Sequence, residues 1–419
     1  MTTPATRATI DAIWRIESAK LVAGLTRSLR DVGLAEELAQ DAFVAALEQW
    51  PTGGVPDEPG AWLMTVAKRR GIDQLRRRTT FERKQEQLIH EISVLERLED
   101  PAFAAAEQPV EDDVLRLVFL TCHPAVPVEG RIALTLKIVG GLTSAEIARA
   151  FLTREPTIAQ RIVRAKRTLA AVRAPFELPS GDELQQRLAP VLDVVYLVFN
   201  EGYAASRGDD WIRPELCGDA LRLARILAAL RPNEPEVLGL QALLELQASR
   251  LHARSTADGT PIRLEDQDRA RWDRLLVRRG LAALDRLTAL ETPLGPYGLQ
   301  AEIAACHARA TSVPATNWPR IVALYDALAT ITGSPVVELN RAVAVAMAFG
   351  PDAGLELVDA LADDPRLAGY HLVDTVRGDL LERAGRTVDA RAAFLRAAER
   401  CENGAERGVL LARANACVD

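Results

Sequence analysis

The side chains in this chain that are best suited to chemistry are cations and amides gathered in one short segment. The stretch TREPTIAQRIVRAKRTL, residues 153–169, carries five cationic side chains and one acid. The whole chain of 419 residues has 51 basic and 58 acidic residues and a formal net charge of −7. Arginine can pair with guanine and glutamine with adenine, while nearby cations neutralise phosphates. The segment could therefore read duplex DNA, although a solvated amphipathic helix is the simpler alternative.

Helical spacing divides the side chains of this segment into two faces. Ile158, Ile162, Ala165 and Leu169 form one apolar stripe that can dock on a core. We expect Thr153 to cap the helix. The opposite face and its shoulders carry the residues that could meet DNA: Thr157, Gln160, Arg161, Val163, Arg164, Lys166 and Arg167.

A second short helix is predicted directly upstream, in GGLTSAEIARAFL, residues 140–152. The two glycines interrupt the preceding helix, Thr143 is an N-cap, and Glu146 stands at the capping-box position. Ile147, Ala148 and Phe151 form its apolar stripe. Two short helices joined by a tight turn, the second one cationic, predict a helix-turn-helix whose second helix suits the major groove.

Another helical pair is predicted near the start of the chain. Residues 34–51 read LAEELAQDAFVAALEQWP, and residues 58–78 read EPGAWLMTVAKRRGIDQLRRR, with a cationic end. Between the two pairs, residues 81–112 hold 3 basic and 9 acidic residues, whereas residues 113–175 hold 10 basic and 4 acidic residues. A cationic block within an acidic chain is typical of a nucleic-acid module in a larger protein.

Taken in order, the two helical pairs resemble regions 2 and 4 of the extracytoplasmic-function (ECF) sigma factors of bacterial RNA polymerase. The segments LDVVYLVFNEGYAAS, residues 192–206, and DGTPIRLEDQDRARWD, residues 258–273, resemble the C-terminal extension of a subgroup with TPR-like helices. The resemblance implies an all-α fold of two small helical sigma domains and a helical-repeat domain. The expected domains are region 2 over 8–80, an acidic linker over 81–112, region 4 over 113–173 and the extension over 182–419.

The same resemblance implies roles for three groups of residues. Core polymerase would be bound by Glu37, Gln40, Asp41 and Phe43. The melted −10 promoter element would be held by Lys68, Arg69, Arg70, Asp73, Arg76 and Arg77. The −35 element would be contacted by Thr157, Gln160, Arg161, Arg164, Lys166 and Arg167. The acidic linker would run near the catalytic channel of the polymerase.

The end of the chain carries a TPR-like pattern of small and large residues. In RGDLLERAGRTVDARAAFLRAAE, residues 377–399, six residues fit TPR positions: Gly378, Leu381, Gly385, Ala390, Phe394 and Ala397. An irregular helical bundle is the alternative.

A β-turn is predicted around Asp258 and Gly259. We expect the extension to contact the sigma domains within the chain and to control their activity in cis, and a protein or peptide regulator is a further candidate partner.

Other classes of function fit the sequence less well. A one-component helix-turn-helix regulator with a TPR-like domain would not need residues 34–78. Catalysis is not expected, because the five histidines lack ligand spacing and Gly140-Gly141 lacks the P-loop lysine, although Tyr203, Asp209, Asp210, Asp266 and Asp268 could line a pocket. The five cysteines form no CxxC pair, so we predict neither disulfides nor a metal site, and we expect no cofactor. Without a signal peptide or an apolar span, the chain is expected to be cytoplasmic and not to bind membranes.

Overall fold

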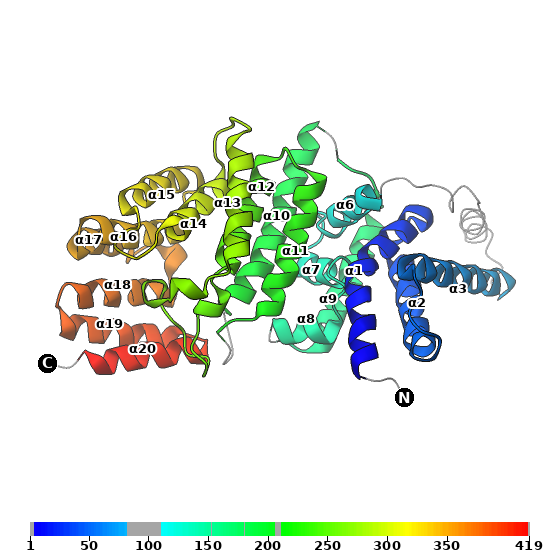
Figure 1. Cartoon of the computed structure of the whole chain (residues 1–419), viewed down its shortest axis with the longest axis horizontal. Helices are drawn as coiled ribbons and strands as arrows, with labels where there is room; N and C mark the ends of the chain where they lie inside the picture. The colour runs from blue at the N-terminus through cyan, green and yellow to red at the C-terminus, as the bar shows by residue number, and fades with distance from the viewer. Residues whose placement is uncertain (1–3, 82–109, 152, 180, 206–210, 418–419) are drawn as a thin grey trace. The chain divides into compact units, whose positions relative to one another are not determined.

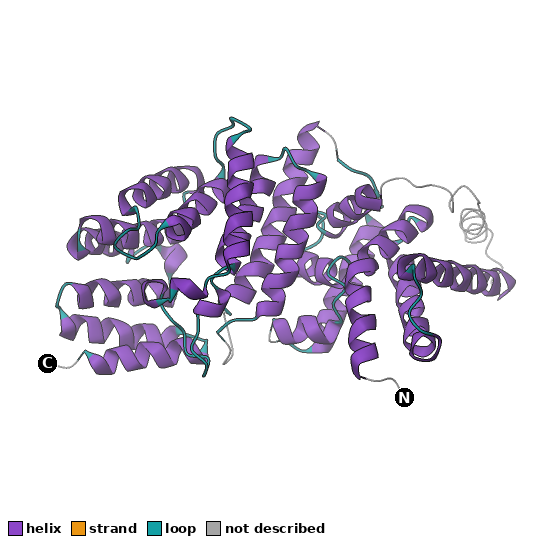
Figure 2. Ribbon diagram, viewed as in Figure 1, coloured by secondary structure: helices purple, strands orange, loops and turns teal. Residues whose placement is uncertain are grey.

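The computed structural model describes residues 4–81, 110–151, 153–179, 181–205 and 211–417. These residues are helical with connecting loops, and Ser255 and Pro261 form an isolated antiparallel bridge (Figure 2). The predicted all-α fold is confirmed. The chain divides into two compact units, Met1–Val194 and Val195–Asp419. The predicted linker falls largely on residues 82–109, and Asp209 and Asp210 also lie outside the described residues.

The first unit opens with three long helices. Helices α1 (Pro4–Leu29) and α3 (Pro59–Phe81) both pack against α2 (Val32–Gly53). The carboxylate of Asp31 caps α2 by accepting from the backbone N–H groups of Gly33 and Leu34, at 2.7 and 3.0 Å. This cap satisfies two of the donors that a helix start leaves unpaired and so fixes the corner between α1 and α2.

The rest of this unit is a group of shorter helices. They are α6 (Val110–Thr121), α7 (Val128–Ile138), α8 (Ser144–Ala150) and α9 (Glu155–Ala171). Helix α6 packs against α1, and α9 packs against both α7 and α8. The long helix α10 (Gly181–Tyr203) follows, and the division between the two units falls within it. Near its start, Arg187 donates from Nη2 to the carbonyl oxygen of Phe119 on α6, at 3.2 Å.

The second unit begins with long, closely packed helices. These are α11 (Pro214–Leu230), α12 (Pro235–Ala248), α13 (Arg274–Thr288) and α14 (Pro296–Arg309), and α12 packs against the other three. A Cβ atom on Gly239 of α12 would lie 2.6 Å from the backbone nitrogen of Gly298 on α14. The two helices therefore cross in direct backbone contact, which requires glycine at this position.

Between α12 and α13 the chain forms a polar excursion with three short 3₁₀ segments. They are η1 (Leu251–Ala253), η2 (Leu264–Asp266) and η3 (Arg269–Arg271). The predicted turn is confirmed, because Gly259 has φ +87° and the N–H of Thr256 donates to the carbonyl of Thr260 at 3.0 Å. Arg269 joins this excursion to the end of α14 by donating to the carbonyl of Ala310 at 2.8 Å.

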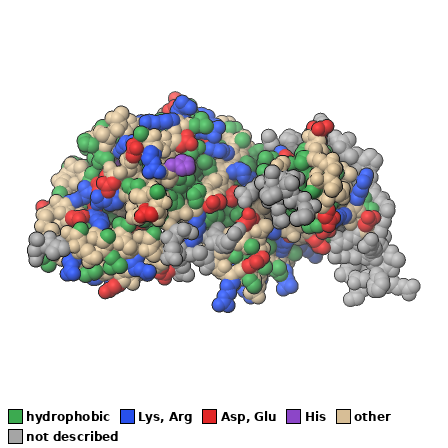
Figure 3. Space-filling view, turned by 60° about the horizontal axis from the view of Figure 1, so that its bottom comes forward, with side chains coloured by type: hydrophobic (Ala, Val, Ile, Leu, Met, Phe, Trp, Pro, Cys, Tyr) green, Lys and Arg blue, Asp and Glu red, His purple; other side chains and the backbone are tan. Residues whose placement is uncertain are grey.

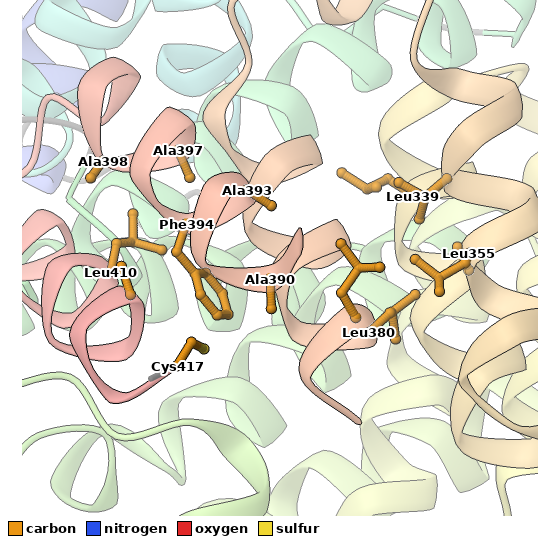
Figure 4. Packing of buried hydrophobic residues seen from close by; sticks show 14 of the residues in the cluster. Leu339, Leu355, Leu380, Ala390, Ala393, Phe394, Ala397, Ala398, Leu410 and Cys417 are labelled. Atoms are coloured by element: carbon orange, nitrogen blue, oxygen red, sulfur yellow. The ribbon is translucent and has the colours of Figure 1, made fainter. Parts of the chain in front are cut away.

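The second unit ends in consecutive helices that pack as neighbouring pairs (Figure 1). They are α15 (Trp318–Thr332), α16 (Pro335–Phe349), α17 (Pro351–Leu361), the short η4 (Pro365–Leu367), α18 (His371–Arg383), α19 (Thr387–Arg400) and α20 (Gly404–Ala416). Phe394 of α19 is fully buried, with Ala390 and Leu410 beside it (Figure 4). A Cβ on Gly378 would lie 2.6 Å from its ring, so α18 and α19 approach closely, as the TPR-like pattern predicts.

Candidate nucleic-acid interface

Helix α9 divides its side chains as the sequence predicts. Ile158, Ile162, Ala165 and Leu169 are all buried. Of the residues predicted to meet DNA, Gln160, Arg164 and Arg167 are exposed, while Thr157, Arg161 and Lys166 are half-buried. The exposed face of this helix therefore includes one amide and two guanidinium groups, together with the exposed side chain of Val163.

The turn in front of α9 is partly as predicted. On α8, Thr143 Oγ1 accepts from the N–H of Glu146 at 3.1 Å, and a Glu146 carboxylate oxygen accepts from the N–H of Thr143 at 2.7 Å, which confirms the capping box. The prediction that Thr153 caps α9 is wrong. The N–H of Thr153 donates to the carbonyl of Ala148 at 2.9 Å, which keeps Thr153 in the turn, and the N-cap is Arg154 without a side-chain hydrogen bond.

Lys166 points at another helix of the same unit. Its ammonium pairs with the carboxylate of Glu36 on α2. Lys137 of α7 lies 3.7 Å from the same carboxylate, and Gln40 donates to it from within α2. The carboxylate of Glu36 therefore interacts with side chains from three helices, α2, α7 and α9. The side chain of Glu36 is only 12% exposed.

A second ion pair of this unit joins α1 to α6. Asp113 of α6 is buried and lies 3.1 Å from Arg27 of α1 and 2.6 Å from Arg116 of its own helix. Because the carboxylate is 4% exposed, it depends on both guanidinium groups for charge compensation. Buried or half-buried ion pairs therefore join α2 to α7 and α9, and α1 to α6.

The basic residues of α3 differ in how far they are buried. Arg69 and Asp73 are exposed, whereas Lys68 is half-buried. Burial, together with the positive charge of Arg27, lowers the pKa of Lys68. Arg70 lies 3.8 Å from Asp41 of α2. The side chains of Arg76 and Arg77, on the last turns of α3, lie outside the described residues.

The residues predicted to bind core polymerase all lie on α2 but differ in exposure. Glu37 is exposed, and Gln40, Asp41 and Phe43 are half-buried. The ring of Phe43 packs on Trp14 of α1, with ring centroids 4.6 Å apart. Phe43 therefore holds α1 against α2 and presents only part of its surface.

Basic side chains are concentrated in particular segments of this acidic protein. On the face drawn in Figure 3, basic side chains lie among acidic ones. An attraction to DNA must consequently come from defined segments such as α9, since the chain as a whole is acidic.

Comparison with known proteins places both helical pairs in one family. The models of Sigma-70 region 2 and of Sigma-70, region 4 match residues 16–81 and 116–169. The "Probable ECF RNA polymerase sigma factor SigI" of Mycobacterium tuberculosis (strain H37Rv) is 28% identical over 162 residues, 38% of this chain and 54% of that protein. The ECF sigma factor SigK of Mycobacterium ulcerans (strain Agy99) is 30% identical over 149 residues, which cover 35% of this chain and 75% of SigK. The chain belongs to the ECF branch of the sigma-70 family.

The similarity of this ECF protein to one relative extends through the C-terminal part. An uncharacterized protein of Rhizobium meliloti (strain 1021) is 44% identical over 386 residues, 91% of this chain and 89% of the relative. Residues 187–288 match a family of unknown function (DUF6596). No solved structure matches the chain. Within the described residues, none of the helices has the length and apolarity needed to cross a membrane.

Glu36 is not among the residues that the sequence predicts to have a role. Its strongest partner, Lys166, is 130 residues away, and a single glutamate on an acidic helix is an ordinary surface residue. No linear spacing could have indicated this pair, because only the packing of α9 near α2 creates it.

Proposed function

We propose that this ECF protein binds core RNA polymerase and directs initiation at promoters that it reads at two elements, with its C-terminal extension controlling that activity in cis. The observation that carries the proposal is the pair of region 2 and region 4 matches in one chain, in that order. This function rests on binding and selection of DNA and needs no catalytic group in the chain. It also places the protein in the cytoplasm, with the polymerase.

The proposed roles of the three segments come from the family resemblance, and the exposure and charge of the side chains support them. The exposed face of α9, with Gln160, Arg164 and Arg167, reads the −35 element, and Thr157, Arg161 and Lys166 flank it. The basic segment of α3 holds the −10 element, and the polymerase is bound by four residues of α2: Glu37, Gln40, Asp41 and Phe43. Phosphate contacts supply salt-dependent affinity, while contacts to base edges supply selectivity.

Control in cis is proposed because the extension is covalently attached to the sigma domains. A covalent link gives two surfaces a high effective concentration, so even a weak contact between them is populated. A separate protein or peptide regulator could act through the same helical-repeat surface.

Run-off transcription with purified core polymerase and a genomic DNA pool tests both parts of the proposal. The full chain is compared with a chain ending at Arg173 and one ending at Val194. The longer truncation is included because Met1–Val194 is one compact unit in which Arg187 donates to Phe119. We expect a specific start with the full chain and an altered yield with the 1–194 form.

Two results would contradict the proposal. If no form directs a specific start, initiation by this protein is excluded. If all forms direct the same start with the same yield, control in cis is excluded. A core polymerase pull-down separates the alternative of a one-component regulator, which would bind promoter DNA but not the polymerase.

A further inference from the structure

Three potential metal ligands meet at one end of the last three helices. Among the residues that the structure describes, His371, Cys401 and Glu406 each offer a ligand atom, and these atoms lie within 4.8 Å of one another. His371 is the first residue of α18, Cys401 follows the end of α19, and Glu406 lies in the first turn of α20. Because α18, α19 and α20 are consecutive neighbours, these helix ends lie together (Figure 1).

Glu406 lies close to both other potential ligands, with a different carboxylate oxygen near each of them. Nε2 of His371 lies 3.3 Å from one carboxylate oxygen of Glu406, and Sγ of Cys401 lies 3.6 Å from the other. Tetrahedral zinc, with bonds of about 2.0–2.1 Å to nitrogen or oxygen and about 2.3 Å to sulfur, separates such ligands by about 3.4–3.6 Å. The three ligand atoms lie within 4.8 Å of one another, so some of them would have to move closer together, by up to about 1.2 Å, to coordinate one ion.

One buried nitrogen of the cluster makes no hydrogen bond. Nε2 of His371 is buried and makes no hydrogen bond, even though a Glu406 oxygen is near. Cys401 is 2% exposed, and its thiol donates to the carbonyl oxygen of Asn403 at 3.5 Å as well as to Glu406. A buried imidazole nitrogen without a hydrogen bond is costly unless another group, such as a cation, occupies its lone pair.

The backbone around the cluster is held in place by other contacts. The side chain of Asn403 caps α20 by accepting from the N–H of Glu406 at 3.0 Å, and it donates to the carbonyl of Ala205 at 3.0 Å. The N–H of Cys401 donates to the carbonyl of Ala397 at 3.0 Å. Preorganised ligand positions reduce the entropy that metal binding would otherwise cost.

We propose that His371, Cys401 and Glu406 form a zinc site with one open position for water. A mixed nitrogen, sulfur and oxygen ligand set suits Zn²⁺, whereas magnesium and calcium prefer oxygen ligands alone. On binding, the S–H bond of Cys401 breaks, the thiolate coordinates the metal, and the proton leaves to solvent. The ion joins the ends of α18, α19 and α20 and stabilises the end of the helical-repeat unit.

Zinc titration of the full-length chain tests this proposal. The protein is stripped with a chelator, and Zn²⁺ binding is measured by competition with a chromogenic indicator and by elemental analysis after dialysis. We expect one zinc per chain, a rise in melting temperature on zinc addition, and release of a proton on binding. Co²⁺ in place of zinc should give the absorption of a cobalt–thiolate bond.

Matched variants assign the ligands. Cys401→Ser, His371→Gln and Glu406→Gln should each weaken zinc binding by more than roughly 100-fold, beyond the usual loss from a residue outside the coordination sphere. Cys417→Ser is the control, since Cys417 is also a buried thiol at the end of α20 and lies beside Glu382 instead of in the cluster. It should retain both zinc and the cobalt–thiolate absorption.

Clear results would overturn the site. Absence of stoichiometric zinc binding by the full chain would do so, and so would a Cys401→Ser protein that keeps the cobalt–thiolate absorption. Should Cys401→Ser fail to fold, His371→Gln decides, because its side chain is partly exposed and the replacement is similar in size. A folded His371→Gln protein with unchanged zinc affinity would contradict the proposal.

Discussion

At the scale of single residues, the exposed guanidinium of Arg164 is the clearest test of promoter reading. Replacing Arg164 with alanine should lower promoter-specific transcription by roughly 5- to 150-fold, since a bidentate base contact contributes about 1–3 kcal/mol. Its neighbours Ile162 and Ala165 hold the helix, so the fold should be unaffected. Run-off transcription and thermal denaturation measure the two effects.

The control for this change is Arg278→Ala on α13. Arg278 is also an exposed arginine, and it is not among the residues proposed to contact DNA, so the variant removes the same charge without removing a proposed contact. Equal losses of transcription in the two variants would show that net charge, and not a contact by Arg164, is responsible.

A second residue-scale prediction concerns His307 on α14. Burial, with the charges of Arg250 and Arg269, lowers the pKa of His307 to about 3. The unfolded chain then binds one more proton than the folded chain between pH 3 and about 6.5. The stability due to neutral His307 is complete above pH 6.5 and is lost as the pH falls, by up to about 1.4 kcal/mol per pH unit.

His307→Gln should therefore show a shallower fall in stability than the parent between pH 6 and 4. Urea denaturation at several pH values measures the difference. His252→Gln, at an exposed position, is the control for the histidine-to-glutamine replacement itself. Parallel curves for His307→Gln and the parent would disprove the lowered pKa.

At the scale of helices, the ion pairs of Glu36 join α2 to α7 and α9. Because the −10 and −35 elements of a promoter are separated along the DNA, we expect these helices to part when both elements are bound. Lys137→Gln should make the separation of α2 from α7 and α9 easier, because it removes one ionic attraction to Glu36. Lys137 is not among the residues proposed to bind DNA or the polymerase.

The expected result for Lys137→Gln is faster formation of the promoter complex, with the same start site. Stopped-flow fluorescence with labelled promoter DNA measures the rate. Arg131→Gln serves as the control on the same helix, because the guanidinium of Arg131 donates to the carbonyl of Val126 and not to Glu36. A slower or unchanged rate for Lys137→Gln would show that this ion pair does not restrain opening.

The packing of α18 on α19 gives another prediction at this scale. Phe394→Ala should destabilise the second unit by about 3–5 kcal/mol, because it leaves a cavity in a closed core. Gly378→Ala should also be destabilising, since its Cβ would meet the Phe394 ring at 2.6 Å. Calorimetry measures the loss of stability in both variants. Val388→Ala is the control, because Val388 of α19 is 69% exposed, and it should change the stability by less than about 0.5 kcal/mol.

At the scale of the whole molecule, a net charge of −7 opposes binding to DNA, so affinity must come from local cations. For the complex with core polymerase, Arg167→Gln should lower the slope of log affinity against log salt by about 0.9, the loss of one phosphate contact. Gln160→Ala should leave the slope unchanged and relax base preference. Fluorescence anisotropy at several salt concentrations distinguishes these outcomes, and an unchanged slope for Arg167→Gln would exclude a phosphate contact.

Much of the fold could be predicted because its signals are local. The buried stripe of α9, the capping box of Thr143 and Glu146, and the small-large pattern around Phe394 each lie within one or two helices. Periodicity and capping depend on neighbouring residues, so the amino-acid sequence by itself determined these elements and the family resemblance they carry. The N-cap of α9 was predicted wrongly because the turn from α8 decides where Thr153 lies.

Only the tertiary structure decided which distant side chains meet. Lys166 pairs with Glu36 across 130 residues, and Cys401 comes to lie beside His371 and Glu406 although no recognised motif has their spacing. Such groups arise when helices pack at a particular angle and register, which periodicity does not encode. The physical reason is that helix formation is governed by neighbours along the chain, whereas a charge pair or a ligand set is governed by neighbours in space.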